Sequence, residues 1–291
     1  MKKYYLVSTD HLEENLWFRD DEDFIVGMNH VAIQVARCPE ILMLAFILMS
    51  NHVHFVMYGT YSQVHEFAIR FKARYSQYYS RKWGAKNILR RNRIDIREIQ
   101  VGDEALERNV AYVQMNCVAA SICAHPTQYR WGTGNLFFKG IDNQQSARPL
   151  SSFSRRAREK MLHSECADIP GDWLVADAGY VLPQSYVATD AVERLFRTPA
   201  RMNYFLNSSS KARKRIEVEK NLPAFRDQVI LQALPDLCQS LFQKPDFQDL
   251  STLEKTEFLR QILFRFSSNV NQVARVCGLT YADAARLLDT A

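Results

Sequence analysis

The chain has 291 residues, 47% of them hydrophobic, with a formal net charge of +5 and six cysteines. This length and apolar content can bury a sizeable core and predict two domains. The chain has no 18-residue apolar window without charges, so we expect no membrane span. Its first residues soon meet charged side chains and lack the apolar region of a signal peptide, so we expect none. Without any Cys-x-x-Cys pair, free thiols in a cytoplasmic protein are expected rather than a zinc ribbon.

The first half of the chain predicts seven elements, in the order β-α-β-β-α-β followed by a helix. They are a strand at 3–9, a helix at 20–37, strands at 41–49 and 51–58, a helix at 61–83, a strand at 94–101 and a helix at 103–123. This order is typical of an α+β fold with a ferredoxin-like antiparallel sheet and helices on one face. Strand 51–58 would then lie centrally. A mixed sheet with the last strand elsewhere is the alternative.

A pair of histidines opens the strand at 51–58. The apolar run at 41–48 before it is typical of a strand buried on both faces, and Asn51 suits a turn or bulge between the two strands. His52 and His54 would point to one face, because side chains alternate along a strand. Two imidazoles on a rigid strand can bind a metal ion. A half-buried strand whose histidines meet ordinary polar neighbours is the alternative.

Residues 61–100 carry ten Lys or Arg and three acidic residues, interleaved with aromatic residues. Basic side chains for phosphates and aromatic faces for bases suit single-stranded nucleic acid. Helical spacing favours core packing for four of the aromatic residues, which are Phe67, Phe71, Tyr75 and Tyr78. The predicted DNA contacts in this stretch are therefore basic, namely Arg74, Arg90, Arg91 and Arg93.

The segment at 103–123 has the pattern of an amphipathic helix with an acidic first turn. Tyr112 and Asn116 are four residues apart, so they share a face of that helix. Alone, Tyr112 is more typical of a residue that packs its ring, and Asn116 of a solvated one. Together with the histidine pair they make a phenol nucleophile beside a three-ligand metal site.

The second half is less regular until about residue 189. Glycines and polar residues at 132–160 predict a hinge, and the chain is helical from about 189. Helices at 253–266, 270–277 and 280–289 have the spacing of a helix-turn-helix, carried by Ala274, Gly278, Ala284 and Leu287. Thr280 and Asp283 form a capping box. The exposed side would present Tyr281, Asp283 and Arg286 to duplex DNA, although any small three-helix packing gives similar spacing.

Four segments resemble single-tyrosine HUH transposases of the REP-associated tyrosine transposase branch. They are Leu16-Trp17-Phe18-Arg19-Asp20, M-S-N-H-V-H-F-V at 49–56, Y-V-Q-M-N-C-V-A-A at 112–120 and H-P-T-Q-Y-R-W-G-T at 125–133. The resemblance covers roughly the first 140 residues, with the motifs in the family's order. One departure is Cys117, where this branch usually has proline. That position shapes the helix and not the chemistry.

The resemblance implies cutting and rejoining of single-stranded or hairpin DNA by a monomer or homodimer. Tyr112 would be the nucleophile and form a 5′-phosphotyrosine. His52, His54 and Asn116 would bind Mg²⁺ or Mn²⁺. A domesticated DNA-binding protein that recognises hairpin or repeat DNA without catalysis is the alternative, although all four site residues are present. A histidine-based nucleotide hydrolase is disfavoured, because a third alternating histidine is replaced by Val56.

Three regions follow from these patterns. We expect an HUH transposase domain at 1–140, a linker at 141–188, and a helical C-terminal domain at 189–291 that contains the helix-turn-helix at about 253–289.

Overall fold

The computed structural model describes residues 1–9, 16–84, 92–120, 122–138, 147–165, 169–209, 225–266 and 268–289. It begins with the predicted β-α-β-β-α-β order. These elements are β1 (Lys3–Thr9), α1 (Asp21–Arg37), β2 (Leu42–Met49), β3 (His52–Gly59), α2 (Tyr61–Trp83) and β4 (Ile94–Ile99). The α+β class is therefore confirmed.

The four strands form one antiparallel sheet in the order β2-β3-β1-β4. This is the ferredoxin-like order, with β4 beside β1 and not in a mixed arrangement. The histidine strand β3 is central, as expected. Ser50 and Asn51 form the tight turn that joins β2 to β3.

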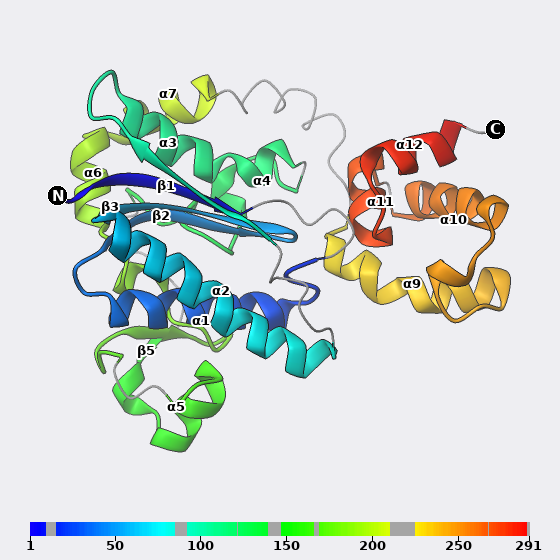
Figure 1. Ribbon diagram of the computed structural model, residues 1–291, viewed down its shortest axis with the longest axis horizontal. Coiled ribbons are helices and arrows are strands. Elements are labelled where there is room, and N and C mark those ends of the chain that lie inside the picture. Colours follow the sequence, from blue (N-terminus) through cyan, green and yellow to red (C-terminus); the bar gives the residue numbers. More distant parts are fainter. Residues whose placement is uncertain are drawn as a thin grey trace.

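Helices cover both faces of this sheet (Figure 1). The predicted pair, α1 and α2, lies on one face, and the opposite face carries α3 (Ala105–Gln114) and α4 (Asn116–Ala119). Alternation along β3 divides its side chains between the two layers. Phe55 packs edge-to-face on Phe67 and Phe71 of α2, whereas the His54 ring meets Tyr112 of α3. The four α2 aromatics whose spacing predicts core packing, Phe67, Phe71, Tyr75 and Tyr78, are buried.

The prediction of a single helix at 103–123 is wrong, because the structure has two helices, α3 and α4, with a break at Met115. The side-chain amide nitrogen of Asn116 donates to the carbonyl oxygens of Tyr112 at 2.9 Å and Val113 at 3.2 Å. Such local side-chain bonds compete with the helical ladder and favour a break. The nucleophile candidate thus lies near the end of α3, and Asn116 begins α4.

The outer edge of β2 is covered by segments from later in the chain. Residues around Gly132 and Val187 form bridges to Ile47 and Met43, and the Leu48 amide donates to the Trp131 carbonyl at 2.9 Å. A Cβ atom on Gly132 would lie 2.6 Å from the Phe46 carbonyl oxygen. Only glycine permits this approach, so the 125–133 motif has a structural role at the sheet edge.

The expected linker at 141–188 is instead largely part of the first core. It contains β5 (Ala147–Pro149), α5 (Arg155–Leu162) and β6 (Leu174–Ala176), and α6 (Thr189–Phe196) and α7 (Pro199–Ser208) follow. Leu162, Val181 and Phe196 are fully buried in the same cluster as the sheet. The expected domain boundary at 189 is therefore not a boundary between two cores, because segments on both sides of it pack in the same cluster. Local periodicity did not show this, since it carries no information about burial between distant segments.

A second core lies in the C-terminal helices. These are α9 (Asp227–Phe242), α10 (Thr252–Arg265), α11 (Val270–Cys277) and α12 (Tyr281–Asp289). Buried residues from Ile230 to Cys277 form their cluster. Short 3₁₀ turns complete the described elements, at η1 (Pro126–Gln128), η2 (Leu150–Ser152), η3 (Pro183–Ser185) and η4 (Phe247–Asp249).

A buried carboxylate joins the two cores. Asp227 accepts hydrogen bonds from Arg275 Nε at 2.9 Å, Gln272 Nε2 at 3.1 Å and Ser50 Oγ at 3.1 Å. Burial acts to raise the pKa of Asp227, but the Arg275 guanidinium and these donors hold it below its ordinary value. Since Ser50 lies in the β2–β3 turn, the C-terminal helices are tied to the hairpin that carries the histidines.

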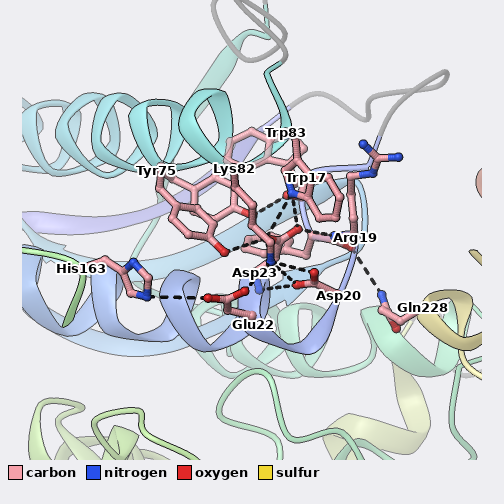
Figure 2. Close-up of polar contacts among 12 residues, drawn as sticks. Trp17, Arg19, Asp20, Glu22, Asp23, Tyr75, Lys82, Trp83, His163 and Gln228 are labelled. Carbon is pink, nitrogen blue, oxygen red and sulfur yellow. Dashed lines mark hydrogen bonds and ion pairs between the residues drawn. The ribbon is translucent and has the colours of Figure 1, made fainter. Parts of the chain in front are cut away.

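A second buried carboxylate joins the start of α1 to the end of α2 (Figure 2). Asp23 has no exposed surface, and it accepts from Tyr78 Oη at 2.9 Å, Lys82 Nζ at 3.0 Å and Trp83 Nε1 at 3.1 Å. Asp20 caps α1 by accepting from the Asp23 amide at 2.8 Å. This network holds together α1 and α2, the two helices that pack on one face of the sheet.

No helix in the described residues is long and apolar enough to cross a membrane. The five cysteines that the structure describes are free thiols.

Candidate active site

The two histidines of β3 lie side by side. Their ring centroids are 4.9 Å apart and the rings are nearly perpendicular. His52 is 5% exposed and His54 is 4% exposed. The strand therefore presents both imidazoles to the α3 face, as the two-residue spacing predicts.

Each imidazole has a polar partner at Nδ1. Ser8 Oγ of β1 lies 2.8 Å from His54 Nδ1, and Asn51 Oδ1 lies 2.8 Å from His52 Nδ1. Asn51 can only accept at that atom, so His52 Nδ1 carries the proton and Nε2 is the basic nitrogen. A serine hydroxyl can accept in the same way from His54. Such contacts set the tautomer and ring orientation of metal-binding histidines.

Tyr112 lies against this pair. Its ring centroid is 5.7 Å from that of His54, in a T-shaped arrangement. Asn116 follows one turn later, is 2% exposed, and is anchored through Nδ2 to the carbonyls of Tyr112 and Val113. Because the amide nitrogen faces those carbonyls, the oxygen Oδ1 is the end of Asn116 that can serve as a ligand.

The donor chemistry of these residues fits a hard divalent ion. Two imidazole Nε2 atoms and an amide oxygen are ligand types that Mg²⁺ or Mn²⁺ accepts when water and phosphate complete the shell. Among the described residues, no group of three or more His, Cys, Asp or Glu side chains could hold a metal ion.

An open groove of about 870 Å³ begins at Tyr112 and Ser8. Its floor is the α3-facing side of β1 and β4, where Leu6 pairs with Arg97. One wall is α3, with Glu104, Arg108 and Asn109, and the other is α7, with Tyr204, Phe205, Asn207 and Ser208. Arg201 of α7 joins the walls by bonding Glu104 at 2.9 Å and Glu107 at 3.2 Å.

Of the basic residues expected to contact DNA in the stretch 61–100, the two that the structure describes do not line this groove. Arg74 lies on α2, which covers the opposite face of the sheet, and its guanidinium donates to Ser164 Oγ at 2.8 Å. Arg93 is exposed just before β4. Arg90 and Arg91 lie outside the described residues. Neither Arg74 nor Arg93 lines the groove.

The turn expected between the last two helices lies between α11 and α12, and their use as a DNA-binding helix-turn-helix stays a prediction. Gly278 ends α11 in the left-handed region at φ 64°, and the Thr280 hydroxyl accepts from the Asp283 amide at 3.1 Å. Tyr281 is 58% exposed. Arg286 is also exposed and pairs with Asp283 at 2.7 Å. These side chains are accessible to a ligand, and DNA binding by them stays a prediction.

Sequence patterns missed Ser8 and the groove wall of α7. Ser8 is polar within an apolar strand, which is a weak signal, and its pairing with His54 depends on strand register. Tyr204 lies outside every recognised motif. Its exposure of 64% next to the buried Phe205 is a tertiary feature.

Comparisons with known proteins give little further information. No protein-family model and no curated protein matches the chain. A solved structure of a REP-associated tyrosine transposase bound to a REP hairpin aligns with 46% of this chain and 77% of its own, at 17% identity and a TM-score of 0.33. Similarity at that level supports no conclusion about activity. Any inference about activity therefore depends on the chemistry of the side chains.

Proposed function

We propose that this protein nicks single-stranded DNA and transfers strands through Tyr112, in a metal-dependent reaction. The observation that carries the proposal is the contact series His52–His54–Tyr112 on one face of the sheet. Asn116 lies one turn beyond Tyr112, and its side-chain amide is oriented by the hydrogen bond that it donates to the Tyr112 carbonyl oxygen. These are a nucleophile and three ligand groups from β3, α3 and α4.

In this proposal His52, His54 and Asn116 hold Mg²⁺ or Mn²⁺ through Nε2, Nε2 and Oδ1. Such an ion, when bound, supplies charge neutralisation and polarisation of a phosphate oxygen. Ser8 and Asn51 keep the imidazoles in the orientation and tautomer that this requires. Burial of the histidines limits their motion, which favours a fixed geometry.

The covalent step belongs to Tyr112. Its phenolic oxygen attacks the phosphorus of a DNA phosphodiester, and the bond from phosphorus to the 3′-oxygen breaks. The phenol loses its proton and the departing 3′-oxygen gains one. The products are a 5′-phosphotyrosine and a free 3′-hydroxyl. Attack by another 3′-hydroxyl reverses the step and joins strands without ATP, since the phosphoester energy is kept.

The alternative function is DNA binding without catalysis. The exposed Tyr281 and Arg286 of α12 favour a role in duplex recognition. That role is compatible with strand transfer, and it would be the whole function only if Tyr112 forms no adduct.

Covalent trapping tests the proposal. The protein is incubated with Mg²⁺ or Mn²⁺ and an end-labelled hairpin DNA that carries single-stranded flanks, and adducts are resolved under denaturing conditions. Wild-type protein should form an adduct, Tyr112→Phe should form none, and His52→Ala should lose adduct formation at every metal concentration. Tyr61→Phe is the matched control, because Tyr61 is 56% exposed on α2. An adduct that persists in Tyr112→Phe would assign the chemistry to another nucleophile.

A further inference from the structure

We propose that the groove between α3 and α7 binds the single-stranded segment of DNA that leads away from the scissile phosphate. Tyr204 would stack on a base, and Arg97 and Arg108 would contact phosphates. The inference rests on the proposed function of Tyr112, which lines the same groove. It assigns substrate contacts to α7, which lies outside the segments that resemble a known family.

Tyr204 has the properties of a stacking platform. It is 64% exposed, while its neighbour Phe205 is 2% exposed. The Phe205 ring meets Tyr204 edge-to-face, with centroids 5.4 Å apart. A ring that is supported on one side and open on the other can accept a base at little entropic cost. An unpaired base has a free face for this ring, whereas a base inside a duplex is stacked on both faces.

The two arginines are placed to contact phosphates. Arg97 and Arg108 lie on the floor and one wall of the groove, and their side chains are 73% and 66% exposed. Arg108 is 3.5 Å from Glu104, but that carboxylate also binds Arg201 at 2.9 Å. Arg97 pairs with Asp95, which is also exposed. Exposed ion pairs contribute little free energy, so a phosphate can replace Glu104 as the partner of Arg108 or Asp95 as the partner of Arg97.

The remaining lining suits a nucleic acid strand. Asn109, Asn207 and Ser208 add donors and acceptors along the two walls. A volume of about 870 Å³ lies near the upper end for sites that hold drug-sized ligands. There is therefore room for nucleotide groups beyond the reacting phosphate.

Equilibrium binding of a fluorescently labelled single-stranded oligonucleotide tests the stacking contact. All variants are made in the Tyr112→Phe background, so that binding is measured without covalent capture. Tyr204→Ala should raise the Kd roughly fivefold to a hundredfold, the range for losing one base–aromatic stack. Tyr204→Phe should retain wild-type affinity. Tyr61→Ala, an exposed tyrosine on the opposite face, is the matched control and should bind normally.

The salt dependence of the Kd tests the phosphate contact. Arg108→Ala should lower the slope of log Kd against log salt by about 0.7, the value for one phosphate on a single strand. Arg70→Ala is the control, because Arg70 forms the same kind of i,i+4 pair with Glu66 on α2. Its slope should be unchanged.

The outcomes separate this inference from the proposed function. If Tyr204→Ala and Arg108→Ala both bind the oligonucleotide as their controls do, the groove is not the DNA path, even when wild-type protein forms the Tyr112 adduct. Equal losses of affinity for a covalently closed circular duplex would also overturn it, since that DNA has neither an unpaired base nor an exposed terminal base pair. Failure of wild-type protein to form any adduct counts against strand transfer alone.

Discussion

Ser8, like Asn51, directly contacts one of the two candidate histidine ligands. It lies opposite His54 in the register of β1 and β3, with its hydroxyl 2.8 Å from Nδ1. A partner at Nδ1 raises the basicity of the distal nitrogen and holds the ring in place. Its role in the proposed chemistry is thus positioning.

Ser8→Ala should weaken Mn²⁺ binding by roughly tenfold to a hundredfold, the usual effect of removing such a partner. Direct Mn²⁺ titration followed by electron paramagnetic resonance in the Tyr112→Phe background measures this without any reaction. Ser8→Thr keeps the hydroxyl and should restore most of the affinity. Equal Mn²⁺ affinity in the alanine and wild-type proteins would remove Ser8 from the site.

At the scale of the elements, Asp23 holds α1 against α2. Burial raises the pKa of Asp23 above its ordinary value, although the hydrogen bonds from the Arg19 amide and Lys82 act to lower it. The carboxylate nevertheless satisfies donors from Tyr78, Lys82 and Trp83 near the end of α2. Removing it would leave Tyr78 Oη and Trp83 Nε1 without their buried acceptor, whereas Lys82 would keep Asp20 and Glu22 as partners.

Asp23→Ala should lower the free energy of unfolding by about 1–3 kcal/mol for each buried donor, Tyr78 Oη and Trp83 Nε1, that it leaves without an acceptor. Glu22→Ala is the matched control, because Glu22 also binds Lys82, at 2.8 Å, but its side chain is 56% exposed. That change should cost under about 1 kcal/mol. Urea denaturation followed by circular dichroism gives both values, and similar losses for the two variants would contradict this account of Asp23.

At the scale of the whole molecule, the Asp227–Arg275 pair connects the C-terminal helices to the histidine hairpin. Arg275 is largely buried and approaches Asp227 at 2.9 Å. The Arg226–Asp21 pair, at 3.0 Å, joins the C-terminal helices to the start of α1 but is about half exposed. The buried pair should therefore dominate the docking.

Arg275→Met should cost about 3–5 kcal/mol in the free energy of unfolding, since it leaves a buried carboxylate without its cation. Arg226→Met should cost under about 1 kcal/mol. Urea denaturation of the full chain compares them. Equal costs would show that the buried pair contributes no more than the exposed one.

The pH dependence of the same pair has a definite sign. The folded-state pKa of Asp227 is below its ordinary value, so its stabilisation is fully present above the unfolded pKa of about 3.9 and is lost as the pH falls through the folded value. Arg275→Met should remove this acid-dependent loss.

Duplex recognition also belongs to the whole molecule, because α12 and the Tyr112 groove are separate surfaces. Arg286→Ala should raise the Kd for duplex DNA and leave covalent adduct formation on single-stranded DNA unchanged. Arg260→Ala, also on the C-terminal helices but on α10, serves as the control. Unaltered duplex affinity in Arg286→Ala would leave α12 as a purely structural helix.

Local periodicity predicted most elements of the sheet domain closely. Helix 61–83 and strand 3–9 have their expected bounds, and the alternation at His52 and His54 predicted their shared face. The break at Met115 was missed, because it depends on where the Asn116 amide donates. Spacing along the helix predicts which side a residue occupies and not which carbonyl its side chain binds.

The sequence by itself determined the element order and the central histidine strand, because these follow from side-chain period, and it supplied the four candidate site residues through their chemistry. Tertiary structure alone decided that Ser8 meets His54, that α7 forms a groove wall, and that Asp227 reaches Ser50. Each of these joins residues far apart in the chain. Such contacts depend on strand register and on the packing of whole elements, which no local pattern encodes.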